Sequence, residues 1–288
     1  MRLAFALLWL LHWLPPAAIS AIAWPLSQLL YLLARERRHV GMTNMRLCFP
    51  ELPVSEHKRI VRANFHHMAR LLLEYGVCWY SSAERIRRLV ELKNLHYLTD
   101  LTAAGHDVII FYPHFTAFEM GCYRLNQDVP LVSVYSHQKN QAMDERIYRG
   151  RQRYNNVKIV SRQESLRSII KAMKAGHTPF LYLPDQDFGP RDSIFVPFFG
   201  VQAATIPGMS RIARLAGARV VPAIARRVGG RYEVEFYPPW DDYPSDDVAA
   251  DTRRMNAFLE DRIRECPEQY FWLHKRFKTR PEGEARFY

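Results

Sequence analysis

Residues 107–125, DVIIFYPHFTAFEMGCYRL, decide how this chain folds. The run from Asp107 to Phe111 has the length and apolar character of a buried strand, whereas Phe118 to Leu125 reads as a helix. Pro113 stands between them and ends the strand, because a proline biases the residue before it towards extended geometry. His114 therefore lies where a strand gives way to a helix, the usual place for a site on an open α/β sheet.

The same alternation continues along the chain. Further strands are predicted at residues 131–135, 157–160, 180–183, 219–223 and 232–237, and further helices at 142–154, 163–175, 207–216 and 251–265. Two more helices, at residues 55–75 and 82–101, precede the first strand. This order predicts an α/β fold, with a mostly parallel or mixed sheet covered by helices on both faces. The sequence shows no internal repeat and no linker, which favours one domain after the amino-terminal segment.

The amino-terminal segment, residues 3–33, is mostly apolar and long enough to span a bilayer. Pro15, Pro16 and Pro25 interrupt it, so a kinked span and an interfacial helical hairpin are both open, with a buried soluble helix as the third alternative. Basic residues follow it directly at positions 35, 37 and 38, and the positive-inside rule then places the rest of the chain in the cytoplasm. We therefore expect a membrane anchor at residues 1–34 and a cytoplasmic domain at 35–288.

Composition limits the class of protein. The 288 residues are 48% hydrophobic and 24% charged, as in a globular protein with a large core. The 40 Lys and Arg against 29 Asp and Glu give a net charge of +11, which suits nucleic acid, an anionic membrane or an acidic protein partner. No helix-turn-helix, RNP or zinc-finger pattern occurs, so nucleic acid is not expected as a partner. The four scattered cysteines form no CxxC pair, which argues against a structural zinc site and favours a reducing compartment.

His114 and Glu119 form the candidate catalytic pair. A neutral imidazole can take a proton from an attacking hydroxyl near neutral pH, and a carboxylate on its other nitrogen would fix the tautomer. Their spacing permits contact if the histidine lies in the turn and the glutamate in the first helical turn. The alternative is structural, because Thr116-x-x-Glu119 is also a capping-box pattern.

Two later stretches carry further candidates. In Pro184-Asp185-Gln186-Asp187-Phe188-Gly189-Pro190-Arg191, which follows a predicted strand, Asp185 and Asp187 would share the sheet edge of His114 if that strand is parallel. An ordinary acidic turn is the alternative, and two aspartates without histidine partners do not make a metal site. The aromatic stretch at residues 193–200 suits either a core strand or the wall of an acyl-chain pocket.

Together these motifs resemble the bacterial lipid A biosynthesis acyltransferases, the late lauroyl/myristoyl-type enzymes of the lysophospholipid acyltransferase superfamily. The resemblance runs from Asn44-x-x-x-Cys48-Phe49-Pro50 to the carboxyl terminus. It is carried by His114-x-x-x-x-Glu119, the motif at residues 184–191, Val196-Pro197-Phe198-Phe199, and residues 267–281, PEQYFWLHKRFKTRP. Many superfamily members have Asp at the position of Glu119, and either carboxylate can orient a histidine.

The resemblance implies a reaction and its partners. A fatty acyl group would pass from an acyl carrier protein thioester, without a further cofactor or metal, to a hydroxyl of a lipid A precursor at the cytoplasmic side of the inner membrane. His114 would be the general base and Glu119 its orienter. An acyltransferase acting on a lysophospholipid is the alternative, and a non-catalytic basic protein tethered to the membrane is a more distant one.

The resemblance also gives the basic residues a use. Arg149 or Arg151 would grip a phosphate of the precursor, for which a guanidinium suits, with a solvated helix face as the alternative. Hydroxyls or an arginine are the expected partners of Asp185 and Asp187, and Arg191 of the same motif is expected to contact the substrate. Lys275, Arg276, Lys278 and Arg280 would meet the acidic carrier protein or lipid headgroups.

Overall fold

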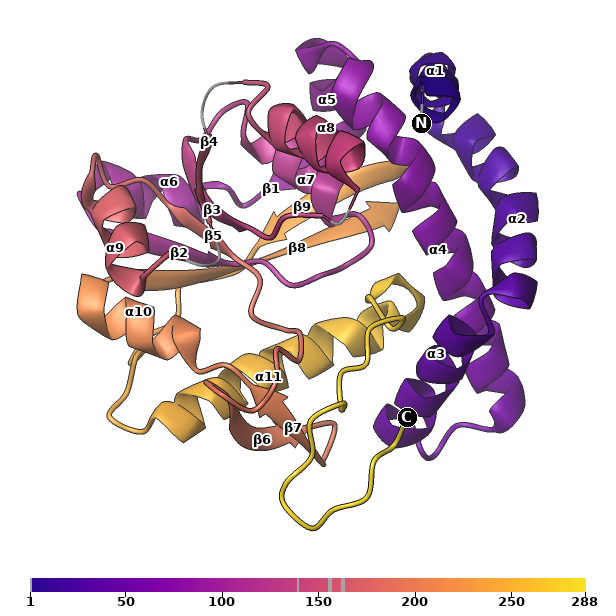
Figure 1. Ribbon diagram of the computed structural model, residues 1–288. Coiled ribbons are helices and arrows are strands. Elements are labelled where there is room, and N and C mark those ends of the chain that lie inside the picture. The colour runs from indigo at the N-terminus through magenta and orange to yellow at the C-terminus, as the bar shows by residue number, and fades with distance from the viewer. Residues whose placement is uncertain (1, 139, 155–156, 162–163) are drawn as a thin grey trace.

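The computed structural model describes residues 2–138, 140–154, 157–161 and 164–288. Its centre is a seven-stranded sheet in the order β1-β9-β8-β2-β5-β3-β4 (Figure 1). The strands are β1 (Val90–Lys93), β2 (Val108–Phe111), β3 (Leu131–Tyr135), β4 (Val157–Ser161), β5 (Phe180–Tyr182), β8 (Arg219–Val228) and β9 (Arg231–Phe236). All neighbours are parallel except β8 and β9, which form an antiparallel hairpin, so the predicted mostly parallel sheet is confirmed.

Helices cover both faces of the sheet because its central strands are apolar on both sides. On one face lie α5 (Ala83–Leu89), α6 (His96–Ala103), α7 (Phe118–Leu125) and α8 (Gln141–Arg151). On the other face lie α9 (Leu166–Lys174), α10 (Gly208–Ala216) and α11 (Val248–Glu265). Strand β2 shows how the layers are filled: Ile109 and Phe111 join the α11 side of the core, whereas Val108 and Ile110 join the α7 side.

Four helices precede the sheet: α1 (Arg2–Leu11), α2 (Pro16–Leu33), α3 (Arg35–Cys48) and α4 (Val54–Tyr80). In Figure 1, α2 runs along the outer side of the long helix α4, and α1 lies near the far end of α4. Gly76 of α4 permits the contact with α1, because a Cβ there would lie 2.2 Å from the carbonyl oxygen of Leu8. Ser20 Oγ and His66 Nε2 join α2 to α4 at 3.0 Å.

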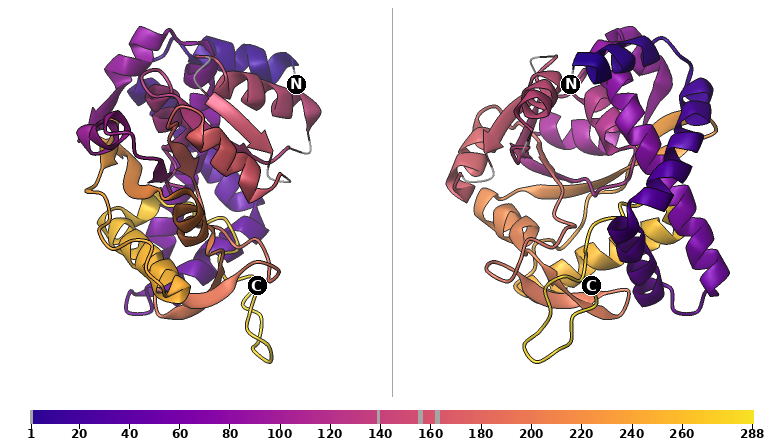
Figure 2. Two further views of the ribbon diagram at one scale, coloured as in Figure 1. Left: turned by 90° about the vertical axis from the view of Figure 1, so that its left-hand side faces the viewer. Right: turned by 45° about the vertical axis from the view of Figure 1, so that its right-hand side comes forward.

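A small hairpin and an irregular terminal segment complete the chain. Strands β6 (Ile194–Phe198) and β7 (Val201–Thr205) pair outside the main sheet, and β6 packs on α11. After α11, a short 3₁₀ helix, η1 (Pro267–Gln269), opens the segment 267–274, here called the C-terminal strap. Asn64 and Asn44 hold the strap, since their side-chain amides donate to the carbonyl oxygens of residues 268 and 270, and of residues 272 and 274, respectively. The turned views of Figure 2 show the loop beyond the strap projecting from the base of the molecule.

Most predicted elements are confirmed within a few residues, but one helix was wrong. The helix predicted at residues 82–101 is interrupted by β1, which adds an edge strand beside β9. Val90-Glu91-Leu92-Lys93 alternates buried or half-buried with exposed residues, a strand pattern too short to stand out between two helices. The predicted start of α9 at Gln163 lies outside the described residues. The first residues of α7, β3 and α10 differ from the predicted first residues by one position at most.

Candidate active site

His114 lies in the turn between β2 and α7, and its ring is held by Asp185. The carboxylate follows β5, which is parallel to β2, so both residues emerge at the carboxyl edge of neighbouring strands, as predicted. Asp185 Oδ1 lies 2.7 Å from His114 Nδ1, and Asp185 Oδ2 accepts the backbone N–H of His114 at 3.0 Å. Tyr270 of the C-terminal strap donates its hydroxyl to the same Oδ2 at 3.1 Å. Asp185 thus binds both the ring and the backbone of one residue.

The charge of Asp185 fixes the tautomer of His114. Burial alone raises the pKa of Asp185, but the His114 ring and the N–H groups that donate to the carboxyl outweigh burial, so its pKa lies below the ordinary value. An ionised carboxylate can only accept hydrogen bonds, so His114 Nδ1 carries the proton. His114 Nε2 is then the basic nitrogen. The ring keeps 18% of its side-chain surface exposed, whereas the Asp185 side chain is fully buried.

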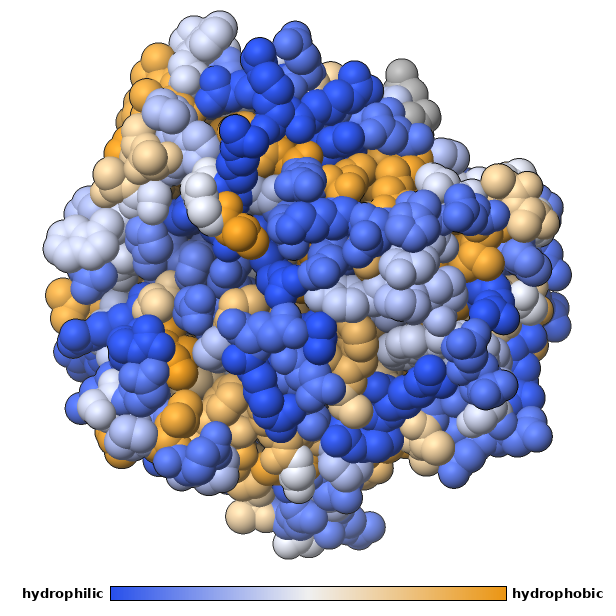
Figure 3. Space-filling view, turned by 180° about the vertical axis from the view of Figure 1, so that it is seen from behind, coloured by the Kyte–Doolittle hydropathy of each residue, from blue (hydrophilic) through white to orange (hydrophobic). Residues whose placement is uncertain are grey.

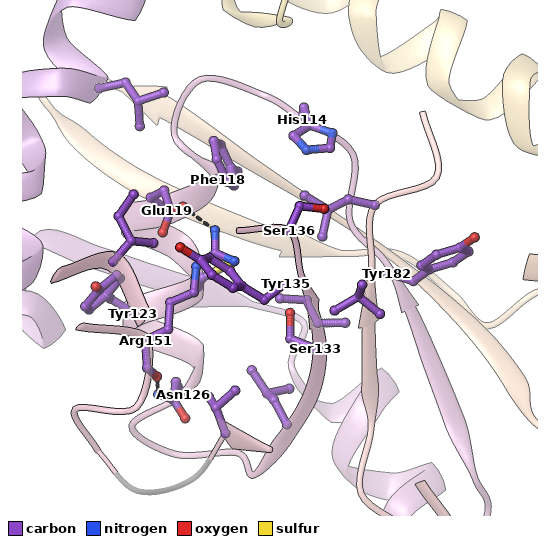
Figure 4. A pocket seen from close by; sticks show the side chains of 18 of the residues that line it. His114, Phe118, Glu119, Tyr123, Asn126, Ser133, Tyr135, Ser136, Arg151 and Tyr182 are labelled. Carbon is purple, nitrogen blue, oxygen red and sulfur yellow. Dashed lines mark hydrogen bonds and ion pairs between the residues drawn. The ribbon is translucent and has the colours of Figure 1, made fainter. Parts of the chain in front are cut away.

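A cavity of about 510 Å³ opens beside the ring. It lies between α4, α7, α8 and the ends of β3 and β5, and much of its wall is apolar, including Leu71, Leu72, Phe118, Leu131, Ile147, Val157 and Leu181. His114 lines one part of this pocket, and Glu119, Ser133, Tyr135 and Arg151 line another (Figure 4). The site therefore joins a base to an apolar hollow large enough for a hydrocarbon chain.

Glu119 does not contact His114 in this structure. Its Oε1 accepts from Arg151 Nη2 at 2.5 Å and from the Tyr75 hydroxyl at 3.2 Å, while its buried Oε2 has no hydrogen-bond partner among the residues that the structure describes. Figure 4 shows the Glu119–Arg151 pair inside the pocket and apart from the His114 ring. The expected contact between Glu119 and His114 is thus replaced by the contact between Asp185 and His114.

The capping box is also replaced. Helix α7 begins at Phe118 with Ala117 as its N-cap and no side-chain cap. Thr116 instead accepts a hydrogen bond from Arg227 of β8 through its hydroxyl, and Glu119 is paired with Arg151. Neither sequence interpretation of Glu119 foresaw an ion pair across the pocket wall, because Arg151 is 32 residues away in the sequence.

The two arginines predicted to bind phosphate have different surroundings. Arg151 keeps 23% of its side-chain surface exposed and is committed to Glu119, which gives a phosphate hypothesis at this position no support. Arg149 has a side chain that is 72% exposed and forms an i,i+4 pair with Glu145 on the outer face of α8. Phosphate binding by Arg149 stays a prediction.

The other motif residues separate into structural and exposed ones. Asp187 accepts the backbone N–H of Gly189, and both the backbone N–H and the hydroxyl of Thr279, so it ties the loop after β5 to the chain beyond the strap. The expectation of hydroxyl partners is met by Thr279 for Asp187 and by Tyr270 for Asp185. Arg191 is exposed in the same loop, and its substrate contact stays a prediction.

Among the four basic residues of the terminal motif, Arg276 is wrongly expected at a docking surface. It is buried and donates to Ala204 O and Thr205 Oγ1, both at 2.8 Å. Within the same motif, His274 Nε2 accepts the backbone N–H of Asp187 at 3.1 Å. Burial, together with the charge of Arg276, lowers the pKa of His274 to about 4, which suits its role as an acceptor.

The aromatic stretch 193–200 contributes to the core through Val196 and Phe198, whereas Phe195 is exposed. Phe198 of β6 is fully buried and packs with Tyr270 and Phe277, and no residue of the stretch lines the described pocket. Of the two alternatives, the core strand is therefore the observed one.

The sequence did not reveal the contacts that two residues make with His114 and its partner. Asp185 was a candidate for substrate binding, and Tyr270 was only part of a motif. The parallel placement of the strands before His114 and Asp185 was the available signal for the first. Tyr270 reaches the site because Phe115 and Tyr270 form an antiparallel bridge between the turn and the strap, a pairing between residues 155 positions apart that no local pattern reveals.

The chain is similar to several known proteins. The sequence pattern of the family described as bacterial lipid A biosynthesis acyltransferase matches residues 2–279. The lipid A biosynthesis lauroyltransferase of Escherichia coli K12 is 36% identical over 98% of this chain and 92% of its own length. The palmitoleoyltransferase of the same organism is 31% identical over the same shares, and its myristoyltransferase is 29% identical over 95% of this chain and 85% of its own. The crystal structure of the 1-acyl-sn-glycerophosphate acyltransferase PlsC from Thermotoga maritima is similar with a TM-score of 0.38 and 15% identity, covering 81% of this chain and 98% of that one.

Proposed function

Because the chain belongs to the bacterial lipid A biosynthesis acyltransferases, we propose that it transfers a fatty acyl group from acyl carrier protein to a hydroxyl of a lipid A precursor. The product would be an acyloxyacyl ester. The observation that carries this proposal is the His114–Asp185 pair at the edge of the apolar pocket. It offers a base beside a place for an acyl chain.

The geometry supports direct transfer with His114 as general base. Nε2 of His114 accepts the proton of the acceptor hydroxyl while that oxygen attacks the thioester carbonyl carbon. Asp185 stabilises the imidazolium that forms, and the tetrahedral intermediate then collapses as the carbon–sulfur bond breaks. The proton on Nε2 passes to the departing thiolate, which restores the neutral ring. Atoms and charge balance without a metal or redox partner.

No covalent acyl-enzyme is required. Cys122 lines the pocket, but burial raises its pKa well above the ordinary value, so the reactive thiolate is scarce near neutral pH. The acyl chain is proposed to lie in the pocket as the thioester, with its carbonyl carbon beside His114. Glu119 and Arg151 are proposed to shape the wall of this pocket by joining α7 to α8.

The test uses the purified full-length chain with acyl carrier protein thioesters of several lengths, and with a lipid A precursor beside a lysophospholipid. Transfer to the precursor hydroxyl, abolished by His114→Ala in folded protein, is the expected result. Transfer to the lysophospholipid alone would refute the proposed acceptor while leaving the base intact. Hydrolysis of the thioester without transfer to either lipid would refute the proposal as a whole.

For the membrane, we propose that α1 and α2 lie along one leaflet as a hairpin and do not span it. By length and composition α2 could cross a bilayer. Its turn with α1, however, is bound by the catalytic domain, because Arg85 of α5 donates to the carbonyl oxygens of Trp13 and Leu14. Both ends of α2 therefore lie beside the same side of the protein.

The outer faces of this hairpin suit a lipid surface. Ile19, Ala23, Ser27 and Tyr31 of α2 are buried towards the protein. Exposed large apolar side chains occupy the other faces of both helices and, with Trp13, the turn between them; those on the helices include Leu3, Leu7, Trp9, Leu10, Ile22, Trp24, Leu29, Leu32 and Leu33. Seen from behind, apolar side chains gather at the upper left edge of the molecule, on the side of α1 and α2 (Figure 3). Tryptophan is one of the side chains enriched at membrane–water interfaces.

The position of the turn separates a hairpin from a span. In closed vesicles that display the catalytic domain outside, Leu14→Cys should react with a membrane-impermeant maleimide, because its turn stays on the domain side. Three of the native cysteines are buried and Cys122 is half-buried, so the background is measured on the unchanged chain. Protection of Leu14→Cys until the vesicles are opened would show that α2 spans the bilayer.

A further inference from the structure

Arg227 is a buried cation beside the catalytic turn that the proposed reaction does not use. It lies near the end of β8, which continues past the end of β2, so its guanidinium meets the turn that follows β2. Its Nη1 donates to Thr116 Oγ1 at 2.7 Å, and its Nη2 donates to Thr116 O at 2.9 Å. Both residues are buried. The guanidinium thus fixes the backbone of Thr116, two residues after His114.

Glu74 of α4 fixes Arg227 in turn. Its two oxygens accept from Arg227 Nε at 3.2 Å and Nη2 at 2.5 Å, a forked pairing that sets the plane of the guanidinium. Glu74 also accepts from Arg70 and from the Tyr232 hydroxyl. Burial alone raises the pKa of Glu74, but Arg227 and Arg70 outweigh it and hold the pKa below the ordinary value. The pair is therefore ionised, enclosed and rigid.

Hydrogen bonds to the C-terminal strap also link the main chain of Arg227 to the same turn. Gln269 accepts the backbone N–H of Arg227 at 2.8 Å and donates to its carbonyl oxygen at 3.1 Å. The carbonyl oxygen of Gln269 then accepts the backbone N–H of Thr116 at 2.7 Å, and the Phe271 N–H donates to the carbonyl oxygen of His114 at 3.0 Å. The turn is held from three sides, by Asp185, by the strap and by Arg227.

We propose that Arg227, oriented by Glu74, is a positioning residue that sets the angle of the His114 ring by anchoring Thr116. This inference rests on the proposed role of His114 as the base. Without the guanidinium, the buried carbonyl of Thr116 loses a charge-assisted hydrogen bond, and the turn is free to shift. Asp185 and the C-terminal strap would then hold a turn that has lost one of its three anchors.

The test compares Arg227→Met and Arg227→Lys with a neighbouring control, Arg226→Met. Arg226 sits on the same strand but points to the opposite face, where it pairs with Glu235 and Glu265 and does not contact the turn. Arg227→Met should lower kcat by roughly 10–100-fold per folded molecule, as expected for a sub-ångström to ångström displacement of a reacting group. KM for the acyl carrier protein thioester should change by less than about twofold, because Arg227 does not line the pocket proposed to hold the acyl chain. Arg226→Met should lower the melting temperature without lowering kcat.

Arg227→Lys and Thr116→Val provide milder arms if Arg227→Met fails to fold. Lysine keeps the charge but cannot make the fork to Glu74 and the two bonds to Thr116 together, so it should restore only part of kcat. Thr116→Val removes one of those two bonds and should lower kcat by several-fold with the fold intact. Turnover like wild type in both folded variants would overturn the proposal.

A readout without substrate separates this inference from the proposed function. The ring ¹³Cε1 signal of His114, assigned by its loss in His114→Gln, should shift in Arg227→Met and stay in place in Arg226→Met. An unchanged signal in Arg227→Met would overturn the positioning role even if the enzyme acts on another acceptor. A shifted signal in a chain that transfers no acyl group would instead support the positioning role and refute the proposed function.

Discussion

Replacing Asp185 by Asn tests whether this carboxylate, and not Glu119, orients His114, the proposed general base. Asparagine has nearly the same shape, but it offers one acceptor oxygen and one amide donor where the carboxylate has two acceptors. Three donors converge on Asp185: the His114 ring at 2.7 Å, the His114 backbone N–H at 3.0 Å and the Tyr270 hydroxyl at 3.1 Å. In Asp185→Asn the amide NH₂ group must therefore point at one of these donors, where no hydrogen bond can form in the wild-type arrangement.

The size of the effect follows from which position the amide takes. If the amide group faces the ring, it donates to Nδ1, and the proton of the imidazole moves to Nε2, where the base is needed. If it faces the backbone N–H and Tyr270, the turn is displaced. Either way we expect kcat to fall by ~10²–10⁴-fold, equivalent to ~3–5 kcal/mol in the barrier, as for other histidines left in the wrong tautomer. KM should stay close to wild type, because the fully buried Asp185 does not line the acyl pocket.

Asp187→Asn is the matched control. Asp187 is also buried and also accepts three hydrogen bonds, but all of them come from Gly189 and Thr279. Both variants should lose about 1–3 kcal/mol of unfolding free energy, since each leaves buried donors unsatisfied. Turnover per folded molecule, measured beside thermal unfolding, should fall steeply only in Asp185→Asn. If Asp185→Asn keeps kcat within about threefold of wild type, the Asp185 carboxylate does not set the tautomer.

Three further outcomes follow from the structure. Arg151→Met should destabilise the protein by about 3–5 kcal/mol, because it leaves the buried carboxylate of Glu119 without its ion-pair partner. Adding Glu119→Gln should restore much of this stability, as measured by thermal unfolding. A double variant no more stable than Arg151→Met would contradict the pairing. The pKa of His274 is lowered to about 4 in the folded protein, so between pH 6.5 and pH 4 only the unfolded chain binds a proton at this residue. Acidification from pH 7.5 to pH 4.5 should therefore lower the free energy of unfolding by ~2–3 kcal/mol more in the wild type than in His274→Gln. Parallel pH profiles of stability for the two proteins would refute this. Trp13→Ser with Trp24→Ser should weaken binding to anionic phospholipid vesicles at unchanged folding, and undiminished binding would place the lipid contact elsewhere.

The sheet could be predicted because its signals are local. Strands β2, β3 and β4 are short runs rich in apolar residues, each with a helix after it, and this alternation predicts a parallel sheet with both faces covered. The edge strand β1 and the hairpin β6–β7 were harder, since β1 is only Val90–Lys93 between two helices and the hairpin stands outside the main sheet. Strand β1 pairs with β9, which is distant in the sequence, whereas β6 and β7 pair only with each other among the described strands.

The site divides in the same way. His114 could be found because a histidine at a strand-to-helix turn is visible in the sequence. Its partner could not be chosen from spacing, since Glu119 is close in sequence while Asp185 is close in space. The pairing of β2 with β5 brings Asp185 to His114, and Arg151 at the end of α8 forms an ion pair with Glu119. The proposed role of Arg227 could not be predicted from the local sequence, because it depends on β8 extending past the end of β2.

The most direct test of the account is acyl transfer by His114→Ala, measured together with its melting temperature. With an acyl carrier protein thioester and a lipid A precursor, the wild-type chain should form the acyloxyacyl ester. His114→Ala should form it at least ~10²–10⁴-fold more slowly, as expected when a general base is removed, while its melting temperature stays near that of wild type. Turnover near wild type in His114→Ala would contradict the assignment of the base, and with it the roles given to Asp185 and Arg227.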